Sequence, residues 1–123
     1  LHLSDGSALM VYQLRHDSGE HYLSGSWVSE SGEVTVLEAG DVTMTPQSVT
    51  RLTITSAVGG REKSKIKAIP LDWRVQAPKL GIDISVTTDR PQSWLATIFP
   101  YWEGPVVVQG SHQGIGYLEL TGY

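Results

Sequence analysis

Apolar and polar residues alternate along most of this chain. Ile82, Ile84 and Val86 are separated by Asp83 and Ser85, and successive side chains of a β-strand point to opposite faces of its sheet. A strand with this pattern buries one face and presents the other to water or to a partner. The alternation therefore predicts strands that lie with one side on a core.

Turn signals divide the chain into short strand-like runs. Small and polar residues at Asp17-Ser18-Gly19-Glu20, at Gly40-Asp41 and at Gly59-Gly60 mark turns, and Pro46 marks a break or a sheet edge. The runs cover residues 7–16, 21–30, 31–39, 42–58, 64–78, 80–88, 93–99 and 101–123. Roughly eight to ten short strands at this spacing are typical of an all-β sandwich or barrel. No convincing helix is found, and the best candidate, 91–97, is short.

The closing stretch from Tyr101 to Tyr123 predicts a two-sided hairpin. If Val108 and Leu118 lie roughly opposite each other, one face is apolar and the other is aromatic and acidic. The apolar face holds Val106, Val108, Leu118 and Leu120, and the other holds Tyr101, Glu103, Tyr117, Glu119, Thr121 and Tyr123. The apolar face is expected on a core, and the other against water, a polar cavity or another domain. Because an unpaired last strand invites aggregation, we expect it to pair with an early strand and close an antiparallel barrel.

Size and charge narrow the classes of function. The 123 residues suffice for one domain, and the net charge of −4 with scattered basic residues argues against nucleic-acid binding. The densest basic group, Arg61, Lys63, Lys65 and Lys67, is interpreted as a solvated turn and strand face. The absence of cysteine excludes disulfides and thiolate chemistry. No run has the length of a transmembrane span.

The start of the chain leaves its cellular compartment open. The sequence begins Leu-His-Leu-Ser, without Met and without a charged and then apolar leader. We expect a processed product or an excised piece, for which earlier removal of a signal peptide stays an alternative.

Few residues suggest chemistry directly. The four histidines, His2, His16, His21 and His112, show no metal-ligand spacing, and no phosphate-binding loop is present, so neither a metal nor a cofactor is expected. Asp72 and Asp83 are interpreted as solvated strand residues. Glu103 and Glu119 lie near Tyr and Trp, where a carboxyl can have a raised pKa and act as an acid.

Aromatic residues supply candidate walls for a ligand site. A barrel of about eight strands can enclose one small ligand, and aromatic side chains offer large apolar surfaces, although most of them serve as core. The candidate ligand-binding residues are Tyr12, Trp27, Trp73, Tyr101, Trp102 and Tyr117.

Two stretches, one near each end of the chain, resemble the carotenoid 1,2-hydratase-related lipocalin-like proteins. The first is Leu9-Met10-Val11-Tyr12 with Leu14-Arg15. The second has two parts, Tyr101-Trp102-Glu103-Gly104 and Gly116-Tyr117-Leu118-Glu119-Leu120-Thr121-Gly122-Tyr123. The nearest branch is the AttH type, often labelled predicted secreted hydrolases. The resemblance spans residues 1–123 and matches the C-terminal half of a two-barrel protein. It implies a lipocalin-like β-barrel domain, a sister N-terminal barrel as partner, and export from the cytoplasm.

Three hypotheses of function follow. The first is a binding domain that holds an apolar small molecule, such as a lipid, terpenoid or polyketide, in its cavity or against the sister barrel. The second, implied by the hydratase branch, is part of a cofactor-free hydratase, cyclase or hydrolase. Glu103 or Glu119 would donate the proton there, oriented by Tyr101 or Tyr117. The hydratases' own catalytic acid has no match in this sequence. The third is a structural half-domain that supports the sister barrel.

Overall fold

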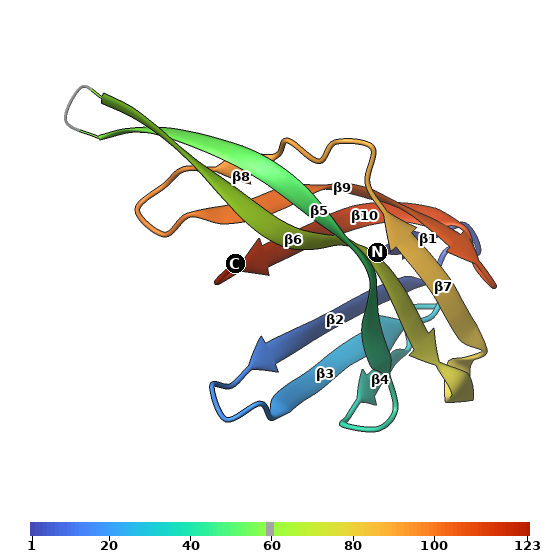
Figure 1. Ribbon diagram of the computed structural model, residues 1–123. Helices are drawn as coiled ribbons and strands as arrows, with labels where there is room; N and C mark the ends of the chain where they lie inside the picture. Colours follow the sequence, from blue (N-terminus) through green and yellow to red (C-terminus); the bar gives the residue numbers. More distant parts are fainter. Residues whose placement is uncertain (59–60) are drawn as a thin grey trace.

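The computed structural model of the 123-residue chain describes residues 1–58 and 61–123, and the side chains outside residues 56–62. Strands make up nearly all of it, as Figure 1 shows. They are β1 (His2–Leu3), β2 (Ala8–Arg15), β3 (His21–Val28), β4 (Val34–Leu37), β5 (Thr43–Val58), β6 (Arg61–Ala77), β7 (Ile82–Thr87), β8 (Trp94–Leu95), β9 (Tyr101–Gly110) and β10 (Gly114–Thr121). A single 3-10 turn, η1 (Pro78–Leu80), joins β6 to β7.

All strand pairs in the described part of the chain are antiparallel. The order across the sheet is β4-β3-β2-β1-β10-β9-β7-β6-β5, and β8 pairs with β9. This confirms the predicted all-β antiparallel fold. The short stretch 91–97 is not helical, since Trp94 and Leu95 pair with Trp102 and Tyr101, which agrees with a sequence that offered no convincing helix. Within the described residues no helix has the length and hydropathy to cross a membrane.

The sheet curls around one core but does not close. Figure 1 shows β5 and β6 crossing over the core opposite β2 and β3. The last strand pairs with the first through His2–Ile115 and Leu3–Gly114, so the predicted pairing with an early strand is confirmed. The two ends of the sheet, β4 and β5, have no ladder between them in the described residues. β4 is only four residues long, and β5 leaves it to form a long hairpin with β6.

Alternation decides which residues form the core. On β7 the odd and even positions separate cleanly, with Ile82, Ile84 and Val86 buried and the residues between them exposed. The inner faces of β6 and β9 add larger side chains, among them Trp73 and Trp102. In the described residues, seventeen buried apolar residues form this cluster on the inner side of the sheet.

The closing hairpin has the predicted faces with a different register. Val108 lies opposite Gly114, not Leu118, and Gly104 lies opposite Leu118. A loop of three residues joins the strands and sets this register. Gly110 at its start has φ of +129°, and a Cβ there would lie 2.5 Å from the carbonyl oxygen of Asp83. The register shift is even-numbered, so Val106, Val108, Leu118 and Leu120 still share the inner face.

Sequence breaks coincide with irregular pairing where the structure describes them. The β5–β6 ladder shifts register between Pro46 and Ser48 and again before Thr50, because proline cannot donate to the ladder. Of the basic group, Lys63 and Lys65 are exposed, and the amine of Lys67 lies 4.8 Å from the centre of the Trp94 ring. The predicted Gly59-Gly60 turn lies outside the described residues.

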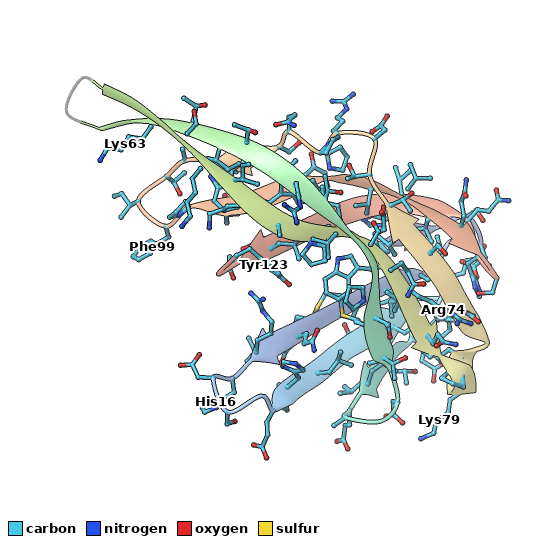
Figure 2. All side chains as sticks on the ribbon, in the orientation of Figure 1. His16, Lys63, Arg74, Lys79, Phe99 and Tyr123 are labelled. Atoms are coloured by element: carbon cyan, nitrogen blue, oxygen red, sulfur yellow. The ribbon has the colours of Figure 1, made fainter. Side chains whose placement is uncertain are left out.

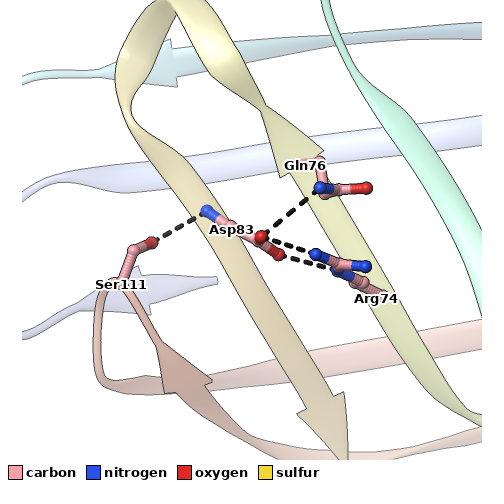
Figure 3. A network of polar contacts seen from close by, with 4 residues as sticks. All are labelled: Arg74, Gln76, Asp83 and Ser111. Atoms are coloured by element: carbon pink, nitrogen blue, oxygen red, sulfur yellow. Dashed lines mark hydrogen bonds and ion pairs between the residues drawn. The ribbon is translucent and has the colours of Figure 1, made fainter.

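Polar side chains on the outer face form a local network at β6 and β7. Arg74 donates to both carboxylate oxygens of Asp83, at 2.9 and 2.7 Å, and Gln76 donates at 3.3 Å. On the other side of Asp83, its backbone N–H donates a hydrogen bond to the Ser111 hydroxyl oxygen, as Figure 3 shows. The hydrogen bonds and charge of Arg74 lower the pKa of Asp83 below its usual value. Asp83 is therefore a solvated strand residue, as predicted.

Truncating the core should destabilise the chain strongly. Ile84 is 1% exposed, so Ile84→Ala should lower the free energy of unfolding by about 2–5 kcal/mol through lost burial and a cavity. Ile66 is 64% exposed and provides a matched control, for which Ile66→Ala should change it by less than about 1 kcal/mol. Urea denaturation measures both. Equal losses would contradict the assigned faces.

The Arg74–Asp83 pair should make the free energy of unfolding depend on pH in the acidic range. A folded-state pKa below the unfolded value means that the ionised carboxyl favours the folded chain. This contribution is present above the unfolded-state pKa and is lost as the pH falls through the folded-state pKa. At neutral pH, the unchanged chain should therefore unfold at a higher urea concentration than the Asp83→Asn variant. In acid, the two urea midpoints should be equal.

Asp17, an exposed carboxylate in the β2–β3 turn, supplies the control for that series. No ion pair of Asp17 is present among the described residues, so Asp17→Asn should leave this pH dependence unchanged. A pH-independent difference between the unchanged chain and Asp83→Asn would contradict the role of this pair.

Candidate functional site

A large hollow in the described part of the chain is a groove between β2 and β10, called here the β2–β10 groove. Its volume is about 820 Å³ and it opens to solvent. Residues 11–17, from β2 and the turn after it, form one side. Residues 117–123, from β10 and the end of the chain, form the other. Figure 2 shows His16 and Tyr123 at the ends of these two sides.

The floor of the groove is apolar. Met44 of β5 and Trp73 of β6 reach it from across the core, and Leu118 and Leu120 line its β10 side from the inner face. The indole N–H of Trp73 donates to the Pro70 carbonyl at 2.8 Å, so the ring presents an apolar surface with its polar atom already bonded. A smaller hollow of about 100 Å³ continues the groove toward Leu1.

Polar groups close the far end of the groove. The guanidinium of Arg15 crosses from β2 to donate to the Thr121 carbonyl at 2.6 Å. The same group lies 3.8 Å from the centre of the Tyr123 ring, a cation–π distance. Burial raises the pKa of the Tyr123 hydroxyl more than Arg15 lowers it, so Tyr123 is neutral at pH 7.

Four predicted site residues line the groove: Tyr12, Trp73, Tyr117 and Glu119. Tyr12 is on the outer face of β2 and packs beside Tyr22, with ring centres 6.2 Å apart. Tyr117 and Glu119 are exposed on the outer face of β10. Only Trp73 of these four belongs to the core.

The other predicted residues lie away from the groove. Trp102 is 0% exposed, and its indole N–H donates to the Pro91 carbonyl. Trp27 is half-buried on β3, with its strand neighbours Leu9 and Thr35. Neither lines the groove.

The two candidate acids face each other across the closing hairpin. Glu103 and Glu119 are opposite residues of β9 and β10, and the Tyr101 hydroxyl donates to Glu103 at 3.3 Å. Burial, followed by the charge of Glu103, raises the pKa of Tyr101, which keeps its proton available for that bond. All three side chains are on the outer face, whereas the apolar floor of the groove belongs to the inner face.

Several residues that line the groove were not among the predicted site residues. Arg15 and Tyr123 belong to the stretches that carry the family resemblance, whereas no sequence pattern indicated a site role for Met44. Arg15 meets Thr121 over a separation of 106 residues, a contact that local sequence patterns do not contain. In the described residues no group of three His, Cys, Asp or Glu side chains could hold a metal ion.

Comparison with known proteins agrees with this architecture. The family model described as AttH-like matches residues 1–123. A crystal structure of a candidate AttH from Nitrosomonas europaea superimposes with a TM-score of 0.72 at 28% identity, over 98% of this chain and 36% of that chain. This chain thus spans about a third of the length of that relative. No curated protein matches.

The family match and the structural match cover the same residues, and both agree with the open lipocalin-like sheet described above. The chain belongs to the AttH-like family.

Proposed function

We propose that this domain is a binding domain whose site is the β2–β10 groove. One observation carries the proposal: the groove of about 820 Å³ combines apolar side chains on its floor with polar side chains along its sides and end, so it offers contacts to the body and to the polar end of one ligand. The sheet does not close in the described residues and the groove lies between β2 and β10, so we place the ligand in the groove and not inside a closed barrel.

An apolar small molecule such as a lipid, terpenoid or polyketide suits the floor. Its apolar body would lie on Met44, Trp73 and Leu118, and a polar end would reach Arg15. Burial of apolar surface would provide most of the affinity, and Arg15 would favour a carboxylate or hydroxyl at the end of the ligand.

A sister N-terminal barrel is the second partner that we propose. Its support is the outer face, where Val34, Val36, Ile115 and Tyr117 are exposed although they are large and apolar. Val34 and Val36 lie on β4, and Ile115 and Tyr117 on β10, so these exposed apolar side chains are spread over a wide face that another protein surface could cover.

Acid–base catalysis is the alternative function. The bond from Tyr101 to Glu103 and the facing position of Glu119 support it. These groups lie on the outer face, so a substrate would have to be held between that face and the sister barrel. The groove therefore provides the stronger argument, and binding is our preferred function.

Titration with palmitic acid and farnesol tests the binding proposal. Each should quench tryptophan fluorescence through Trp73, and native mass spectrometry should show one bound molecule. Leu118→Arg places a charge on the groove floor and should weaken binding at least about tenfold, or 1.4 kcal/mol. Val36→Arg, on an exposed residue away from the groove, should leave binding unchanged. Equal affinities of the two variants, or no binding by the unchanged chain, would refute the groove as the site.

A further inference from the structure

At its closed end the β2–β10 groove has the width of one strand. Near its closed end, β1 lies between β2 and β10, paired with β2 through His2–Ala8 and with β10 through His2–Ile115. Neighbouring strands are about 4.8 Å apart, so β1 holds β2 and β10 about 9.6 Å apart. β1 ends after two residues, while β2 continues to Arg15 and β10 to Thr121.

Backbone groups on both sides of the groove have no partner strand. Leu9 of β2 exchanges two hydrogen bonds with Leu1, at 2.8 and 2.9 Å. Because alternate residues of an antiparallel strand direct their N–H and C=O groups to the same side, Val11 and Gln13 direct theirs into the groove. Across the described residues no ladder joins β2 to β10.

The β10 side follows the same rule. Ser4 donates to the Gln113 carbonyl at 2.8 Å, which places the backbone groups of Gln113 and Ile115 on the side of β1. Tyr117 and Glu119 therefore also direct their N–H and C=O groups into the groove. The groove thus has two facing rows of free donors and acceptors, the arrangement that receives an added strand.

Leu1 already occupies the first position of this missing strand. Its side chain lies over Gly116, where a Cβ would come within 2.6 Å of a Leu1 methyl group. Its α-amino group donates to Leu9 and is half-buried, and burial lowers its pKa. An amide nitrogen in a continuing chain would make the same bond without the cost of burying a charge.

We propose that the β2–β10 groove holds the extended segment that leads into Leu1 in a longer form of this protein, so that β1 is the end of a longer strand. This inference goes beyond the proposed function, because a strand of the protein itself, and not a small molecule, would occupy the same groove in that form. The strand would run antiparallel to both β2 and β10 and would join the two halves of the sheet.

The register of β1 predicts the side-chain pattern of that segment. The first residue before Leu1 would lie between Met10 and Tyr117, facing outward, and the second between Val11 and Leu118, facing inward. The second side chain would enter the hollow of about 100 Å³ beside Trp73, which accepts a branched apolar residue. The third would face outward beside Glu119, where a cation is favoured.

Two five-residue extensions test this inference. Thr-Val-Lys-Val-Thr joined to Leu1 places valine at the inward positions, and Val-Thr-Lys-Thr-Val has the same composition with the faces exchanged. The first should raise the thermal midpoint and slow hydrogen exchange at Val11, Gln13, Tyr117 and Glu119 at least about tenfold, as for amides in a paired strand. The second should do neither.

The palmitic acid titration separates this inference from the proposed function. If the matched extension slows exchange and also prevents probe binding, segment and probe occupy the same groove: the strand proposal stands, and the groove is a ligand site only in a form without that segment. If the two extensions slow hydrogen exchange at these amides equally, or if neither slows it, the strand proposal is overturned. Probe binding by the unextended chain would then still support the groove as a ligand site. If neither extension nor probe enters the groove, both proposals fail.

Discussion

Backbone hydrogen bonding across the sheet is the constraint on which this structure depends. Every inner strand needs partners on both sides, and in the described residues the seven strands between the end strands β4 and β5 have neighbours on both sides in a single antiparallel order. β1 is the weak point, because its two residues supply the only strand pairing in the described residues between the β2–β3–β4 part and the β10–β9–β7–β6–β5 part. The groove, its apolar floor and the contact of Arg15 with Thr121 all follow from the shortness of β1.

The position of the hollows explains why the groove, and not the interior, is the candidate site. Trp73, Trp102 and the aliphatic residues of β7 and β9 occupy the inside of the curved sheet. The two hollows found in the described residues lie beside this core, between β2 and β10, where the sheet is incomplete and apolar side chains of the inner face meet solvent.

Alternation predicted the faces of strands well and the uses of aromatic residues less well. Ile82, Ile84 and Val86 are buried as the pattern indicated. Trp102 was predicted to line a ligand site although it shares the parity of Val106 and Val108, a signal that was sufficient to place it in the core. Tyr12 gave no such signal, because Met10 and Leu14 on its face are as apolar as Leu9 and Val11 on the other. Closure of the barrel failed as a prediction because the ends of a sheet meet through long-range geometry.

Hydrogen exchange along β2 of the unextended chain tests the central claim, that one side of this strand lacks a partner. The amides of Met10 and Tyr12 bond to β3, and those of Val11 and Gln13 face the groove. The account predicts slow exchange at Met10 and Tyr12 and fast exchange at Val11 and Gln13. Uniform protection of all four amides would show that β2 is paired on both sides and would contradict it.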